Sequence, residues 1–226
     1  MTFLFLHIPK TAGSSLTGEL QRALQPSLHL FLDMANNPPS AAPALMAEKV
    51  RRHAEAINAD RYRLVAGHFR YRDLVNAGVR GGVVTVLRHP VSRVVSSFHY
   101  SRQAGNPQQQ FYLDETDSLE AFASLGKQQN VLHDWLSAYP GEPLDAVIDR
   151  VLTDFAFVGL TETYDRDLAR LMRLIGAEAP ANLRERVGSY PPPSDATRDL
   201  IAELNPVDMA LYTRVAAALD ERLSAA

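Results

Sequence analysis

The chain has 226 residues, of which 46% are hydrophobic and 22% charged, and its formal net charge is −3. These values predict one soluble globular domain over residues 1–226. The absence of cysteine excludes disulfides, thiolate zinc sites and a cysteine nucleophile. Because the sequence shows neither a long apolar run nor a basic leader, we expect a cytoplasmic protein without a membrane span.

The small net charge hides a basic middle segment. Residues 51–102 hold ten arginines and three acidic residues, so this segment carries +7 and the rest of the chain −10. A basic segment in an acidic chain indicates local anion binding and no nucleic-acid surface. The alternative is that these arginines lie on solvated helix faces.

The first motif is an apolar run, residues 3–8, followed by a polar loop and a helical pattern. Such a strand, loop and helix start form an anion site, since loop N–H groups and the helix dipole point at one spot. The nucleotide-hydrolase loop G-x-x-x-x-G-K-[ST] is absent. The alternative is an ordinary turn with a polar cap. The candidate phosphate or sulfate ligands are Pro9, Lys10, Thr11, Ala12, Gly13, Ser14 and Ser15.

Two further strands are predicted next, at residues 28–33 and 62–67, with a helix at 44–57 between them. The second strand delivers His68 at its carboxyl end. Ligands of open α/β sheets bind at that end of the strands, so His68 is a candidate functional residue. A histidine packed in the core is an equally good interpretation.

The clearest buried strand is predicted at residues 83–87, because it is β-branched, uncharged and preceded by two glycines. Arg88 follows it, and Pro90 predicts a helix that starts near Val91. Arg88 and Ser96 then converge on one anion, which a guanidinium suits well when the anion is a phosphate. Alternatively, Arg88 and Arg93 form surface ion pairs.

The remaining chain predicts helices at 129–138, 143–155 and 164–175, a strand at 155–160 and two closing helices. Asp117-Ser118-Leu119-Glu120 resembles a capping box before a short helix. Pro206 predicts the first position of the last helix, with Asn205 as its cap. We expect Trp135 to be a core residue, and the less favoured alternative is that it forms a platform for the acceptor.

Three of these segments resemble the sulfotransferases that use 3′-phosphoadenosine 5′-phosphosulfate (PAPS), and most closely the carbohydrate branch that contains heparan sulfate 2-O-sulfotransferase. HIPKTAGSS is similar to the family's 5′-phosphosulfate loop, and VVTVLRHPVSRVVSSF to its 3′-phosphate segment. GHF is similar to the segment that supplies the catalytic histidine of the uronyl branch. FVGLTETYDRDLARL resembles a later strand and helix of the family.

The resemblance implies an α/β fold like that of P-loop nucleotide kinases, with a central parallel sheet flanked by helices. It implies sulfuryl transfer from PAPS to a hydroxyl, most simply of a carbohydrate, with PAP as product and no metal. Lys10 would stabilise the sulfuryl group and the leaving phosphate, His68 would be the general base, and Arg88 and Ser96 would bind the 3′-phosphate.

Two other functions stay open at this point. One is an ATP-dependent small-molecule kinase of similar fold, and the other is a non-catalytic member that binds a nucleotide or a glycan. The sequence leaves the acceptor and the oligomeric state undetermined. We expect the acceptor pocket to be built from three variable loops, at residues 34–44, 101–116 and 182–194.

Overall fold

The structure is a computed structural model that describes residues 1–32, 39–106, 116–178 and 190–224. Parts of the three predicted acceptor loops therefore lie outside the described residues: 34–38, 107–115 and 182–189. Among the helices that are described, none is both long and apolar enough to cross a bilayer.

Within the described residues, five parallel strands form one sheet in the order β2-β3-β1-β4-β5. The strands are β1 (Phe3–Leu6), β2 (Ser27–Leu30), β3 (Leu64–Gly67), β4 (Gly82–Leu87) and β5 (Phe157–Leu160). β1 pairs with β3 on one side and β4 on the other. Strands β3, β4 and β5 are buried throughout, as in a parallel sheet that is covered on both faces.

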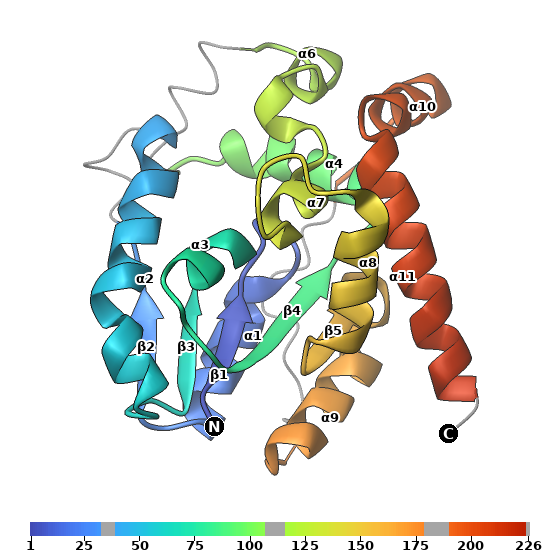
Figure 1. The fold of residues 1–226 in the computed structure, drawn as a ribbon. Helices are drawn as coiled ribbons and strands as arrows, with labels where there is room; N and C mark the ends of the chain where they lie inside the picture. The colour runs from blue at the N-terminus through green and yellow to red at the C-terminus, as the bar shows by residue number, and fades with distance from the viewer. Residues whose placement is uncertain (33–38, 107–115, 179–189, 225–226) are drawn as a thin grey trace.

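Helices cover both faces of the sheet (Figure 1). Phe5 of β1 packs with α1 (Gly13–Ala23) and α9 (Tyr164–Ile175). Leu4 and Leu6 belong to the opposite cluster, which includes α2 (Ala42–Asn58), α3 (Tyr71–Asn76), α8 (Leu144–Thr153) and α11 (Pro206–Ser224). Successive side chains of a strand point to opposite faces, so β1 lies in the middle of three layers. The predicted fold class is confirmed.

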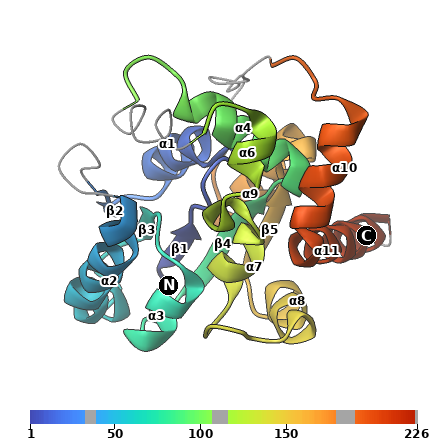
Figure 2. The ribbon, with the colours of Figure 1, turned by 90° about the horizontal axis from the view of Figure 1, so that it is seen from above.

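A third group of short elements lies over the carboxyl ends of the strands, as Figure 2 shows from above. It contains α4 (Pro90–Ser101), α6 (Leu119–Ala123), α7 (Val131–Leu136) and α10 (Asp195–Leu204). Three single turns, Pro39–Ala41, Gly126–Gln128 and Thr161–Thr163, complete the described elements. Val94, Phe122 and Ile201 join α4, α6 and α10 in one buried cluster.

Helices α7 and α11 cap each other. Asp208 of α11 accepts hydrogen bonds from the backbone N–H groups of Leu132 and His133, both at 2.8 Å. In return, the side-chain oxygen of Asn130 accepts from the N–H groups of Val207 at 3.1 Å and Asp208 at 3.2 Å. Each helix thereby satisfies N–H groups that the other leaves unpaired. These bonds fix α7 over the carboxyl ends of the strands.

Every helix and strand that the sequence predicts is present, with ends that differ by a few residues. The short helix predicted after Asp117 is present as α6, but its cap is Ser118, which accepts from the N–H of Ala121 at 3.1 Å, and not Asp117 as the capping-box pattern predicted. The sequence did not predict α3. This helix begins where the N–H of Arg70 donates to Asp73 at 2.8 Å.

Candidate functional site

The loop between β1 and α1 has the backbone shape of an anion cradle. Lys10 and Ala12 both have left-handed backbones, with φ of 69° and 63°. Left-handed residues that alternate with ordinary ones turn successive N–H groups toward one side, which makes a concave anion site. The first turn of α1 adds the N–H groups of Gly13, Ser14 and Ser15, where the helix dipole is positive.

The three loop hydroxyls have different surroundings. Thr11 is buried, and its hydroxyl donates to the carbonyl of Ile8 at 2.9 Å. Thr11 therefore braces the loop with its side chain and can serve an anion through its N–H. Ser14 is exposed and Ser15 is half-buried, so their hydroxyls are accessible to a ligand at the start of α1.

Arg88 joins the two anion motifs at the carboxyl ends of the neighbouring strands β1 and β4. Its Nη1 donates to the backbone carbonyl of Lys10 at 3.2 Å. The Lys10 ammonium lies 3.7 Å from the centre of the Tyr100 ring. Tyr100 lies one helical turn after Ser96, which is buried on the same side of α4. The fold thus gathers Lys10, Arg88 and the α4 face that carries Ser96.

Glu162 lies near Arg88, although the sequence analysis did not single it out. Burial lowers the pKa of Arg88, and the Glu162 carboxylate opposes that shift. Glu162 is held by the N–H of His89 at 2.9 Å and by the hydroxyl of Tyr212 at 2.8 Å. A signal existed for this residue, since Glu162 lies two residues after the end of β5, at the edge where ligands of such sheets bind.

Arg93 is buried, with 2% of its surface exposed, so it does not form the surface ion pair that the sequence left open. Its Nη2 donates to the carbonyl of Gln128 at 2.6 Å. Burial lowers its pKa to about 10, while the buried Asp208 nearby favours its charged form. Arg93 is therefore still a cation at neutral pH and anchors the segment that leads into α7.

His68 follows β3 and is exposed to solvent on one side. Its Nδ1 lies 2.7 Å from the carbonyl oxygen of His7. Because a carbonyl only accepts, Nδ1 carries the proton, and the lone pair of the neutral ring is on Nε2. Desolvation of the imidazolium by the surrounding protein lowers the pKa of His68. The hydrogen bond to the carbonyl of His7 raises this pKa, and the positive charge of Lys10 lowers it further. The ring is thus a neutral base at pH 7.

His7 connects the base to the loop, and the sequence analysis did not single it out. Its ring centre lies 4.1 Å from that of His68. Its other neighbour is Gly13, where an added Cβ would lie 1.9 Å from Cδ2 of His7. Burial is the main reason that the pKa of His7 is well below its usual value. Its position at the end of β1, next to the polar loop, was the available signal.

Trp135 of α7 lies on another side of His68. The two ring centres are 6.1 Å apart and the rings meet edge to face. The guanidinium of Arg70 lies 5.9 Å from the Trp135 ring centre. No group of three or more histidine, aspartate or glutamate residues that could bind a metal is found among the described residues.

No protein-family model matches the sequence, and no curated protein matches it. One solved structure that it resembles is a sulfotransferase from Alicyclobacillus acidocaldarius, with a TM-score of 0.53 and 17% identity over 95% of both chains. The chain has the sulfotransferase fold. The likeness extends over nearly the full length of the bacterial enzyme.

A second similar structure is mouse sulfotransferase SULT7A1 in complex with PAP. The TM-score is 0.47 and the identity is 15%, over 89% of the present chain. The chain spans 62% of the length of that mouse enzyme.

Proposed function

We propose that the chain is a PAPS-dependent sulfotransferase that transfers a sulfuryl group to the hydroxyl of a carbohydrate acceptor. The observation that carries this proposal is the hydrogen bond from Arg88 to the carbonyl of Lys10, at 3.2 Å. It joins two anion-binding motifs that lie 78 residues apart. A donor with phosphate groups at both ends of its nucleoside needs two such motifs at one sheet edge.

The residues present fit PAPS in two places. The left-handed backbones of Lys10 and Ala12 and the first turn of α1 suit the 5′-phosphosulfate. Arg88 and Ser96 suit the 3′-phosphate, because a guanidinium fork matches phosphate oxygens. PAPS would supply an activated sulfuryl group, which carries less negative charge than a phosphoryl group and so depends less on a metal.

His68 is the proposed general base. Its Nε2 takes the proton of the acceptor hydroxyl while the hydroxyl oxygen bonds to sulfur and the bond between sulfur and the phosphate oxygen breaks. The carbonyl of His7 holds the proton on Nδ1, at 2.7 Å, and so keeps Nε2 available. Lys10 neutralises the charge that the leaving phosphate gains. Its ammonium is placed on the same edge, over Tyr100.

Calorimetric titration with PAP, 5′-AMP and ATP with Mg²⁺ tests this function. We expect PAP to bind most tightly of the three. Arg88→Ala should weaken the affinity for PAP by about 10–100-fold and leave the affinity for 5′-AMP nearly unchanged, since charge-assisted hydrogen bonds contribute roughly 1.5–3 kcal/mol. Arg80→Ala is the matched control, because Arg80 is exposed at the opposite end of β4.

Three results would contradict the proposal. ATP with Mg²⁺ binding as well as PAP would favour the kinase alternative. Equal losses of affinity in Arg88→Ala and Arg80→Ala would mean that Arg88 has no specific role. Retained PAP binding without sulfuryl transfer, unchanged by His68→Ala, would identify a non-catalytic binding protein.

A further inference from the structure

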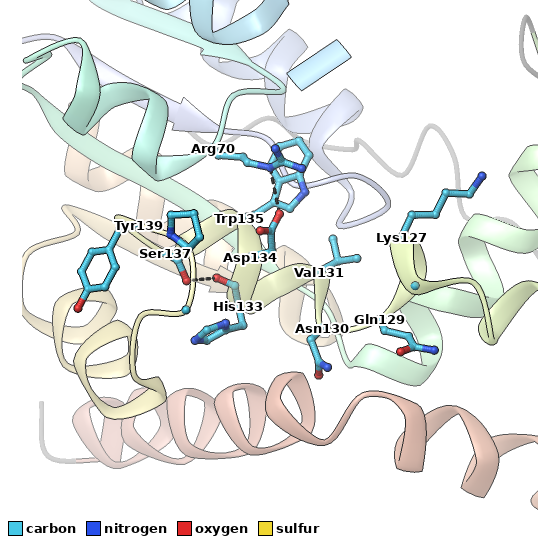
Figure 3. Close-up of a pocket in the computed structure, with 13 residues that line it drawn as sticks. Arg70, Lys127, Gln129, Asn130, Val131, His133, Asp134, Trp135, Ser137 and Tyr139 are labelled. Carbon is cyan, nitrogen blue, oxygen red and sulfur yellow. Dashed lines mark hydrogen bonds and ion pairs between the residues drawn. The ribbon is translucent and has the colours of Figure 1, made fainter. Parts of the chain in front are cut away.

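A pocket of about 380 Å³ lies beside α7. Figure 3 shows Arg70, Asp134 and Trp135 grouped together, with Lys127 and Gln129 toward one end and Tyr139 toward the other. These residues come from the end of β3, from α7 and from the chain on either side of α7. They do not belong to the three loops that the sequence analysis expected to form the acceptor pocket.

The pocket and the candidate base share Trp135. Its indole lines the pocket and also meets the His68 ring, with the ring centres 6.1 Å apart. Arg70, which also lines the pocket, follows His68 by two residues in the chain.

We propose that this pocket binds the acceptor, and that Trp135 is the platform for a hydroxyl-rich ring, that is, a sugar. The proposal rests on the proposed function, in which an acceptor hydroxyl must reach Nε2 of His68. It assigns to α7 a binding role in addition to its place in the core.

The chemistry of the lining favours a sugar over a hydrophobic phenol. Asp134, Gln129 and Tyr139 offer acceptors and donors for several hydroxyls. Nε of Arg70 lies 3.0 Å from Oδ2 of Asp134, and Arg72 pairs with Oδ1, so the two guanidinium groups hold the carboxylate in place. An indole face packs against the C–H face of a sugar, and its edge tolerates water.

The platform is rigid before any ligand binds. Asp208 accepts from the N–H groups of Leu132 and His133 at 2.8 Å, which fixes the first turn of α7. Arg93 fixes the preceding segment through the carbonyl of Gln128 at 2.6 Å. A preorganised platform loses little conformational freedom on binding, which favours affinity.

The single tryptophan of the chain makes the pocket directly observable. We expect carbohydrates identified on a glycan array to change the intrinsic fluorescence of Trp135 in a saturable way, with the PAP complex as the starting state. An alkylphenol at equal concentration should leave the fluorescence unchanged. The reverse pattern, or PAP binding by the wild type with no glycan bound on the array, overturns the proposal.

Variants separate the platform from the donor site. Tyr139→Ala and Trp135→Leu should raise KM for the sugar about tenfold and leave PAP affinity unchanged. Leu174→Ala is the control, because Leu174 is 50% exposed on α9, across the sheet. An unchanged KM in Tyr139→Ala, which is exposed and safe to truncate, also overturns the proposal. If the wild-type protein does not bind PAP at all, the proposed function itself is wrong.

Discussion

His68 owes its proposed role to two neighbours that act in different ways. The carbonyl of His7 fixes the tautomer, and the protein around the ring favours its neutral form. A general base works best when its pKa lies near or just below the working pH. A lowered pKa therefore keeps His68 in its active form throughout the neutral range.

The pH dependence of the rate should report this base. Because the pKa of His68 is lowered from 6.5, kcat/KM should be constant at neutral pH and fall only as the pH drops through a value below 6.5. His68→Asn should lower kcat by about 10²–10⁴-fold and remove this acid limb. An acid limb that persists in His68→Asn, or unchanged PAP-dependent turnover, would assign the base to another residue.

Gly13 is a position where a single methyl group decides the shape of the loop. A Cβ there would lie 1.9 Å from His7, whereas a Cβ at Gly18 in the same helix would meet nothing within 4 Å. We expect Gly13→Ala to displace His7, to weaken the affinity for PAP tenfold or more and to lower the free energy of unfolding by about 1–3 kcal/mol. Gly18→Ala should stabilise it by roughly 0.5–1 kcal/mol.

Calorimetry of PAP binding and urea unfolding measure both effects. The two variants add the same atom to the same helix, so their difference isolates the contact with His7. If Gly13→Ala binds PAP like the wild type, the ring of His7 is not part of the loop architecture that we describe.

At the scale of elements, the reciprocal caps of α7 and α11 hold the pocket wall. Asp208→Ala removes two hydrogen bonds to α7 and leaves the buried Arg93 without its nearest acid, so the free energy of unfolding should fall by about 2–4 kcal/mol. Asp145→Ala is the control. Asp145 lies in the first turn of α8, and its side chain is 85% exposed. Its replacement by alanine should lower the free energy of unfolding by less than roughly 0.5 kcal/mol.

Urea unfolding monitored by circular dichroism measures this difference, and the fluorescence of Trp135 reports on α7 in the folded state. Equal stability losses in the two variants would mean that the caps are not coupled to the core.

The sequence predicted elements well where the signal is local. Pro90 and Pro206 begin α4 and α11, and Gly176 ends α9 with a left-handed backbone at φ 72°. Helix α3 was missed because it has only six residues, too few to show an amphipathic period, and its start depends on the bond from Arg70 to Asp73.

The same distinction holds for the candidate site. Lys10, His68 and Arg88 could be proposed from the sequence because each follows a predicted strand, and parallel strands bring their carboxyl ends to one edge. Glu162 and the contact of His7 with Gly13 were not predicted, and Trp135 was assigned to the core. The surroundings of Glu162 and Trp135 depend on residues far along the chain: Tyr212 lies 50 residues after Glu162, and the Trp135 ring meets that of His68.

At the scale of the molecule, the sheet order unites residues that the sequence separates. β1 pairs with β4, so the loop after β1 meets Arg88 although Arg88 comes 78 residues after Lys10 in the chain. The proposed donor site is thus a product of the central strand pair, whereas the proposed acceptor pocket depends on α7 and its caps. Substitutions in the two regions should change donor and acceptor binding separately.

The central position of β1 also has a consequence for synthesis on the ribosome. β1 precedes both of its partners in the chain, and β3 and β4 follow at Leu64–Gly67 and Gly82–Leu87. During translation the segment Phe3-Leu4-Phe5-Leu6 leaves the exit tunnel without a strand on either side. An unpaired apolar strand is prone to aggregate. Chaperone contact with the nascent chain should therefore be greatest before β4 emerges, and it should end when the sheet closes around its first strand.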